Sequence, residues 1–131
     1  MNQPPEGLRG DGRLVSCFRC ALAGIWHTLR TQRNARIHLG ITAGVVLLGV
    51  WLGLGWTEWA VLVLTVAVVF VAEMFNTALE ATLDLACPAY HPLAKIGKDV
   101  AAGAVLLAAI LAVVVGLLIL GPHLWEIVRR P

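Results

Sequence analysis

Three long apolar segments constrain the fold of this chain more than any other feature. They run from about residue 37 to 56, from about 59 to 85 and from about 94 to 120. Each one meets the length of roughly 20 apolar residues that a helix needs to cross the hydrocarbon core of a bilayer. A hydrophobic fraction of 59% beside a charged fraction of 14% lies outside the usual balance of a soluble domain. The sequence therefore predicts an all-α integral membrane protein with three transmembrane helices.

The residues before the first apolar segment divide into two parts. Residues 1–12 are polar and rich in proline and glycine, so we expect a disordered cytoplasmic lead and not a signal peptide. From about residue 13 to 34, apolar side chains share one helical face that arginines border or oppose. That pattern is typical of an amphipathic helix on a membrane surface, and packing against the other helices is equally compatible with it. Residues 121–131 are expected to form a short C-terminal tail.

Lysine and arginine indicate the orientation. Six of the ten lie before residue 37, Lys95 and Lys98 lie in the second connection, and the first connection has none. Cytoplasmic loops carry an excess of basic residues, so the N-terminus and the second connection are predicted to be cytoplasmic and the first connection to lie outside. Arg129 and Arg130 then fall on the outer side, but eight basic residues against two support the assignment.

Two features carry little functional information. The formal net charge of +2 is too small to indicate nucleic-acid binding. Cys17 and Cys20 form a CxxC that lacks the glycine and proline of a redox loop, and no second pair completes a metal site. We therefore expect free thiols and no nucleic-acid partner.

The second apolar segment ends in a polar stripe, within the stretch EMFNTALEATLD. At 100° per residue the polar residues share a sector of about 100°; they are Glu73, Asn76, Thr77, Glu80 and Asp84. Ionisable residues within membrane segments are rare, usually functional, and face a bundle interior or a water-filled cavity. A helix end whose acids only reach the headgroups is a plausible alternative for Asp84, and a poorer one for the more deeply placed Glu73.

The spacing of these acids suits two kinds of chemistry. Carboxylates one or two helical turns apart can hold a hard divalent cation through oxygen, or act as a base toward a hydroxyl. Lys98 and Asp99 enter from the same side, and a lysine there can neutralise phosphate while a carboxylate such as Glu80 holds a bridging cation. The residues alone therefore predict a membrane enzyme or an ion carrier with its site at the cytoplasmic interface.

A family resemblance narrows this choice. The chain contains EMFNTALEATLDL, with LRTQRNARIHL before it and HPLAKIGKDVAAGAVLLAA after it. These segments resemble the small prokaryotic diacylglycerol kinase and undecaprenol kinase family over roughly residues 13–120, and RNxRIHL looks more like the undecaprenol kinase branch. The resemblance implies a surface helix and three spans in the bacterial inner membrane, assembled as a homotrimer with active sites between subunits. It also implies phosphoryl transfer from ATP to a lipid hydroxyl, with Mg²⁺.

The resemblance assigns roles residue by residue. Glu73 matches the family's catalytic base, Glu80 its metal ligand and Asn76 the polar residue between them. The residues expected to contact ATP are Arg13, Glu80, Lys98 and Asp99.

Gln32 departs from the family pattern, because it stands where other members have a second metal-binding glutamate. Glutamine offers a carbonyl oxygen but no charge, so a cation between Glu80 and Gln32 would meet one carboxylate fewer. We interpret the change as a variation with weaker or differently shared metal binding, while altered substrate choice and lost activity stay open. Cys20 and Ala23 also replace a tyrosine and a lysine of some relatives, which leaves nucleotide contacts from the surface helix open.

The histidines carry weaker signals. His91 is interpreted as a loop or cap residue and not as a catalyst. His38 follows an arginine-rich turn, and contact with a phosphate and packing at the interface are equally open. The neighbouring Arg33 and Arg36 suit either ATP or anionic lipid headgroups.

The leading hypothesis is an ATP-dependent lipid kinase that acts on undecaprenol. The alternative within the same class is a diacylglycerol kinase that makes phosphatidic acid. From another class, the chain could be a non-catalytic membrane subunit whose polar stripe binds a partner helix or conducts ions. The presence of all five expected site residues argues against a non-catalytic subunit; they are Glu73, Asn76, Glu80, Lys98 and Asp99. The uncharged Gln32 at a metal position keeps that alternative open.

The three-span model predicts that the two ends of the chain lie on opposite sides of the membrane. Single cysteines placed at Glu6 and Arg130, in a background without Cys17, Cys20 and Cys87, should react with a membrane-impermeant reagent from the inside and from the outside respectively. Labelling of both positions from the same side would contradict the model.

Overall fold

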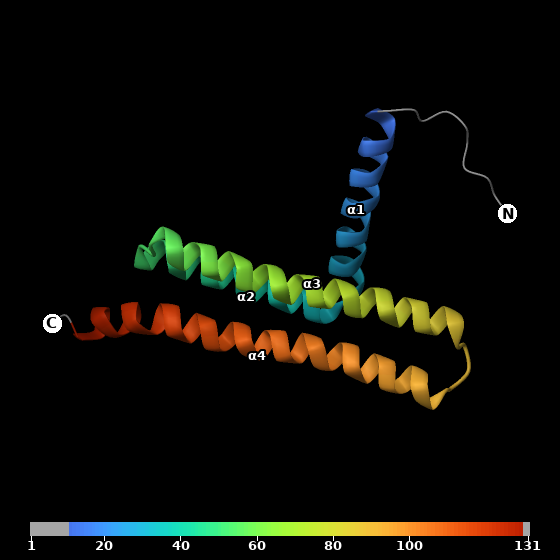
Figure 1. Ribbon diagram of the computed structural model, residues 1–131. Coiled ribbons are helices and arrows are strands. Elements are labelled where there is room, and N and C mark those ends of the chain that lie inside the picture. The colour runs from blue at the N-terminus through green and yellow to red at the C-terminus, as the bar shows by residue number, and fades with distance from the viewer. Residues whose placement is uncertain (1–10, 130–131) are drawn as a thin grey trace.

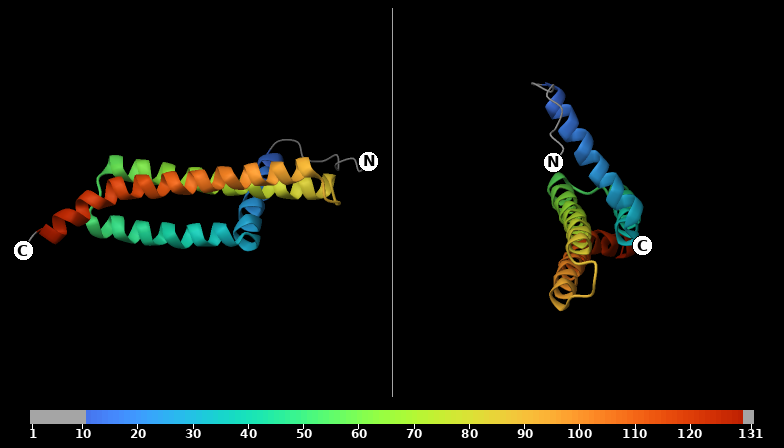
Figure 2. Two further views of the ribbon diagram at one scale, coloured as in Figure 1. Left: turned by 90° about the horizontal axis from the view of Figure 1, so that it is seen from below. Right: turned by 90° about the vertical axis from the view of Figure 1, so that its right-hand side faces the viewer.

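The computed structural model describes residues 11–129, with side chains from residue 14 onward. This part of the chain forms four helices, shown in Figure 1: α1 (Asp11–Thr31), α2 (Arg33–Leu52), α3 (Trp56–Ala86) and α4 (Pro92–Arg129). Helices α2, α3 and α4 run alongside one another, whereas α1 points away, transverse to their long axis (Figures 1 and 2). The predicted all-α architecture is confirmed. Most of the expected N-terminal lead, residues 1–10, lies outside the described residues.

Helices α2, α3 and α4 are each long and apolar enough to cross a membrane. Their bounds differ from the expected ones mainly at the C-terminus, where α4 continues beyond Leu120 to Arg129 with Pro122 inside it. In the sequence, the Gly-Pro pair at 121–122 indicates the end of a helix, because proline lacks an N–H and clashes with the preceding turn. The helix passes through this pair, so residues 121–129 extend α4.

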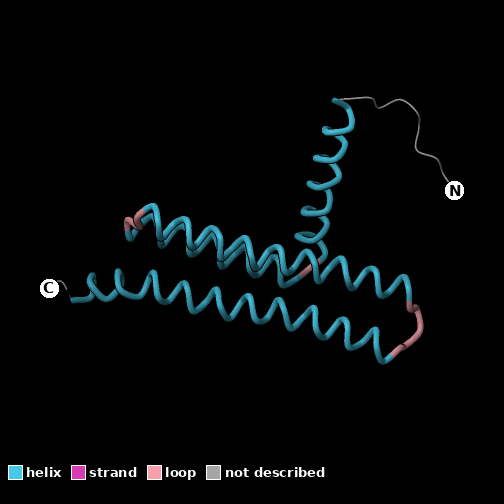
Figure 3. Tube along the Cα trace, in the orientation of Figure 1, coloured by secondary structure: helices cyan, strands magenta, loops and turns pink. Residues whose placement is uncertain are grey.

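Short connections join the helices (Figure 3). Gln32 alone separates α1 from α2, and its extended backbone (φ −91°, ψ 119°) makes the corner. Gly53 ends α2 with a φ of 69°, a left-handed conformation that glycine adopts without strain. His91 caps α4, because its Nδ1 accepts a hydrogen bond from the Leu93 N–H at 3.2 Å. This contact agrees with the interpretation of His91 as a cap residue.

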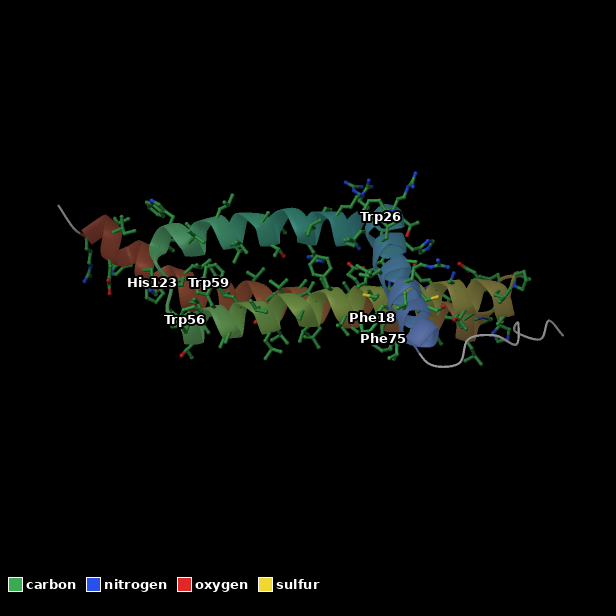
Figure 4. The ribbon with its side chains drawn as sticks, turned by 90° about the horizontal axis from the view of Figure 1, so that it is seen from above. Phe18, Trp26, Trp56, Trp59, Phe75 and His123 are labelled. Carbon is green, nitrogen blue, oxygen red and sulfur yellow. The ribbon has the colours of Figure 1, made fainter. Side chains whose placement is uncertain are left out.

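The helices do not pack equally. Helices α3 and α4 contact each other along most of their length, while α2 touches them at fewer positions (Figure 2). A small core of Leu54, Leu62 and Leu120 forms at the end where α2 meets α3, with Trp59 packed against it. Figure 4 shows Trp59 and His123 together at this end of the molecule. Most other large apolar side chains of the three spans are exposed, as expected of surfaces that face lipid or another protein chain.

Helix α1 keeps its apolar face exposed. Five side chains of this face are at least 63% exposed, and Figure 4 shows two of them, Phe18 and Trp26; the five are Leu14, Val15, Phe18, Leu22 and Trp26. The face is therefore not covered by the described part of its own chain. A transverse helix with a bare apolar face favours the membrane-surface interpretation over packing within the chain. Cys17 and Cys20, on the same helix, are free thiols as expected, and both are exposed.

Gly49 is predicted to be required for the close approach of α2 to the start of α3. A Cβ there would meet Leu54 Cδ1 at 2.9 Å and the Trp59 ring at 3.0 Å, whereas a Cβ at Gly44 would meet nothing within 4 Å. Gly49→Ala should therefore be less stable than Gly44→Ala by about 1–2 kcal/mol, since overpacking typically costs that much. Unfolding of both variants in the same detergent, by titration with a denaturing detergent, measures the difference. Equal stabilities would show that the Trp59 ring moves aside freely.

Candidate functional site

The polar stripe of α3 is graded in burial along the helix. Glu73 is 1% exposed, Asn76 and Thr77 are also buried, Glu80 is half-buried and Asp84 is exposed. The residues share one face because they follow the three- and four-residue spacing of a helix. The stripe therefore runs from the interior of the helix bundle out to its open end.

Glu73 is the largest fully buried side chain of the described residues. Its Oε1 lies 3.5 Å from Nε2 of His38 on α2, and this oxygen has no hydrogen-bond partner. The hydroxyl of Thr77 bonds to the Glu73 carbonyl and not to its carboxylate. Burying an ionised carboxylate without hydrogen bonds is expensive, so this position needs a reason beyond packing.

Glu80 is held by two neutral amides. The Asn76 Nδ2 donates to Oε1 at 3.0 Å, and the Gln32 Nε2 donates to Oε2 at 3.5 Å. Within residues 14–129, Glu80 forms no salt bridge with a lysine, arginine or histidine. Amide donors orient the carboxylate and leave its negative charge uncompensated.

The groups around Glu80 fit a hard cation. The Oδ1 of Asn76 is buried and lacks a hydrogen-bond partner, so an unused oxygen lies on the residue that already bonds to Glu80. Gln32 can add its own oxygen if the amide turns over, because the nitrogen now faces Glu80. Carboxylate and amide oxygens are ligands that Mg²⁺ accepts. No group of three His, Cys, Asp or Glu residues suited to a metal occurs in the described chain, so the remaining ligands would have to come from a substrate or water.

Lys98 and Asp99 lie outside this buried cluster. Lys98 pairs with Asp84 across α3 and α4, and Lys95 pairs with Asp99 at 2.5 Å along α4. Helix α3 has 31 residues and α2 has 20; the difference, 31 − 20 = 11 residues, extends α3 past the start of α2 by roughly 16 Å. The two pairs therefore sit on a projecting end of the α3–α4 hairpin. The predicted nucleotide contact Arg13 has its side chain outside the described residues.

An apolar groove leads toward Glu73 from the opposite direction. Its volume is 430 Å³, and α2, α3 and α4 all line it. His38 and Thr42 lie among its lining residues at one end, and Leu120 lies toward the other. Val69 lines it from α3, and Glu73 follows Val69 by four residues on the same helical face. The buried carboxylate thus lies about one helical turn beyond the lining residue Val69, at the start of the polar stripe.

Two contacts of the site were not predicted from the sequence. Gln32 was assigned by resemblance alone, yet it makes the corner between α1 and α2 and contacts Glu80. For His38 the sequence leaves two roles open, contact with a phosphate and packing at the interface, whereas the structure places it against Glu73. A signal existed, because a short turn centred on residue 54 makes α2 and α3 antiparallel. Reflection through that turn places residue 38 level with residue 70 (2 × 54 − 38 = 70), less than one turn from Glu73.

The fold and the site define a multi-pass membrane protein with an intramembrane acidic cluster next to a lysine-bearing end. The chain belongs to the prokaryotic diacylglycerol kinase family, whose model matches residues 19–120. It is therefore a lipid kinase of that family, and membership of a kinase family implies ATP as the phosphoryl donor.

Individual relatives carry two different names. The chain is 41% identical to an undecaprenol kinase of Bacillus subtilis over 112 residues, which cover 86% of this chain and 91% of the relative. It is 49% identical to a diacylglycerol kinase of Synechocystis over 112 residues, or 85% of this chain and 64% of the relative. A diacylglycerol kinase of Escherichia coli is 33% identical over 78 residues, 60% of this chain and 64% of the relative. The chain thus spans less than two thirds of the length of the latter two.

Proposed function

We propose that this protein transfers the γ-phosphoryl group of ATP to the hydroxyl of undecaprenol at the cytoplasmic face of the bacterial inner membrane. The observation that carries the proposal is the place of Glu73, a buried carboxylate about one helical turn beyond the apolar groove and at the start of the polar stripe. A lipid alcohol has the matching form, since its long apolar tail ends in one reactive hydroxyl. The tail lies in the groove and the hydroxyl reaches Glu73.

In the proposed reaction Glu73 acts as the general base. The O–H bond of the lipid alcohol breaks and its proton passes to the carboxylate, while the freed oxygen bonds to the γ-phosphorus. The bond between that phosphorus and the bridging oxygen of ADP breaks, and ADP leaves. Asn76 supports the site by holding Glu80 beside it.

The nucleotide is proposed to bind at the projecting α3–α4 end, through Lys98, Asp99 and Arg13, with Glu80 facing its phosphates. Lys98 must exchange Asp84 for phosphate oxygens. In the Lys98–Asp84 pair the Asp84 side chain is exposed and the Lys98 side chain is half-buried, and solvent-accessible pairs contribute only about 0–1 kcal/mol. The exchange therefore costs little, and the pair keeps the lysine close to its working position.

Mg²⁺ is proposed to be held by Glu80, with amide oxygens of Asn76 and Gln32 and with phosphate oxygens of the nucleotide. The two amides that now fix Glu80 leave its charge available. Bound there, the cation would supply neutralisation of the charge on the transferring phosphoryl group.

Undecaprenol is proposed over diacylglycerol because the relative that this chain matches over 91% of its length is named an undecaprenol kinase. The diacylglycerol alternative is supported by the 49% identity to a relative of that name. Both acceptors present a primary hydroxyl on an apolar body.

We also propose a homotrimer with its active sites between subunits. The exposed apolar surfaces of the three spans and of α1 exceed what one chain covers by itself. Chemical cross-linking in a mild detergent, read by mass, should give a trimer as the largest product. A protein that stays monomeric and is fully active would contradict this assembly.

The acceptor is tested by transfer of radiolabelled γ-phosphate with undecaprenol and diacylglycerol offered side by side to the purified protein. Label should enter undecaprenol phosphate at the higher kcat/KM. Preferential labelling of phosphatidic acid would establish the alternative, and label in neither lipid would favour a non-catalytic subunit.

Glu73→Gln should abolish most of the phosphoryl transfer while the protein stays folded. The amide keeps the shape of the side chain but cannot accept the hydroxyl proton, and loss of a general base typically lowers the rate by about 10²–10⁴-fold. The matched control is Glu126→Gln, an exposed glutamate of α4, which should keep the parental kcat. Parental activity in folded Glu73→Gln would remove Glu73 from the mechanism.

Gln32→Glu should lower the Mg²⁺ concentration that gives half-maximal activity. A second carboxylate in a partly shielded site attracts the cation more strongly than an amide does. Without Mg²⁺ the same variant should unfold more easily than the parent, since it replaces the hydrogen-bond donor to Glu80 with a like charge. An unchanged Mg²⁺ midpoint in both Gln32→Glu and Gln32→Ala would place Gln32 outside the metal site.

A further inference from the structure

We propose that His38 is a positioning residue that holds the Glu73 carboxylate for proton transfer. The inference rests on the proposed function, because it assigns a task within the same site. This role differs from the two that the sequence left open for His38, because the residue faces a carboxylate within the helix bundle.

Among the described residues, no other side chain forms a hydrogen bond with the Glu73 oxygen in this contact. The Nε2 of His38 lies 3.5 Å from the Oε1 of Glu73, and their side chains are 19% and 2% exposed. Oε1 has no other partner, and the nearby Thr77 hydroxyl is already used on a backbone carbonyl. Among the described residues His38 is therefore the side chain placed to solvate this oxygen.

A buried general base needs such a partner. The terminal torsion of a glutamate is broad, so an unsupported carboxylate turns freely about its last bond. Misplacement of a reacting group by about 1 Å can lower a rate roughly 10²-fold. Donation of Nε2–H to Oε1 fixes the carboxylate plane and leaves Oε2 to receive the proton of the lipid hydroxyl.

The separation of 3.5 Å is longer than a normal hydrogen bond, and catalytic hydrogen bonds are often long before substrate binds and shorten in the complex. His38 also lies among the lining residues at one end of the apolar groove. During transfer, the hydroxyl proton goes to Oε2 of Glu73 and the lipid oxygen takes the phosphoryl group from ADP. His38 keeps its Nε2 proton throughout and acts only through Glu73.

The first test compares two substitutions at His38. His38→Leu should lower kcat by about 10–10²-fold and change the KM values for ATP and lipid by less than about twofold, because only the orientation of the base is lost. His38→Gln should recover most of kcat, since its amide nitrogen can donate to the same oxygen. The control is His27→Leu, an exposed histidine of α1, which should keep the parental kcat. Equal losses in the Leu and Gln variants, or a loss confined to KM, would overturn the proposal.

A double variant tests whether His38 acts through Glu73. In a Glu73→Gln background, His38→Leu should cause no further loss of the residual rate, because the group that it positions is already gone. An additional loss as large as in the parental background would assign His38 a task independent of Glu73.

The second test does not require kinase activity. With ¹⁵N-labelled imidazoles in detergent micelles, Glu73→Gln should shift the ring resonances of His38 and leave those of His123 in place. Glu58→Gln is the matched control, because Glu58 lies 3.5 Å from His123 at the other end of the bundle and should do the reverse. Unmoved His38 resonances in Glu73→Gln would overturn the contact. A parental protein without kinase activity would instead overturn the proposed function, and the imidazole shifts would still decide the contact.

Discussion

The structure depends on the solvation of one carboxylate within an apolar helix bundle. A charged side chain at membrane depth is tolerated only where protein or water replaces the lost hydration. Glu73 meets this condition by facing α2 and not lipid, which requires α2 to be rotated so that His38 points inward. The rotation in turn directs Thr42 and the apolar residues of α2 into the groove that ends at the same place. The groove and the burial of Glu73 therefore both follow from the orientation of α2.

From Glu73 outward, the stripe changes from a dry to a wet environment within about three turns. Glu80 is oriented by uncharged amides, whereas Asp84 has a lysine as its partner. Electrostatic interactions are strong where water is excluded and weak where it is present. The buried part is thus suited to moving a single proton, and the exposed part is suited to exchanging partners with a highly charged, water-soluble molecule.

The sequence predicted the spans and the polar stripe because both depend on periodicity along a single helix. Length and hydropathy predict α2, α3 and α4, and the 100° repeat places Glu73 and Glu80 on one face. Contacts between helices were not predictable in this way, since periodicity does not set the rotation of one helix against another. Two contacts depend on that rotation: the one between His38 and Glu73, and the ion pair between Lys98 and Asp84. The extension of α4 beyond Leu120 was not predicted, because a proline usually ends a helix and this helix continues through Pro122.

The single-residue corner at Gln32 has a consequence for how this chain can change in length. A residue inserted at this extended corner would change the direction and rotation of α2 relative to α1, and a deletion would join α1 directly to α2. The insertion would displace the Gln32 side chain from Glu80, and the deletion would remove that side chain and change the direction in which α1 points. The five-residue connection at 87–91 lies at the projecting end, and its length does not set the position of Gln32 or of α1. Length variation in natural or engineered versions of this chain should therefore accumulate at the second connection and be absent from the corner.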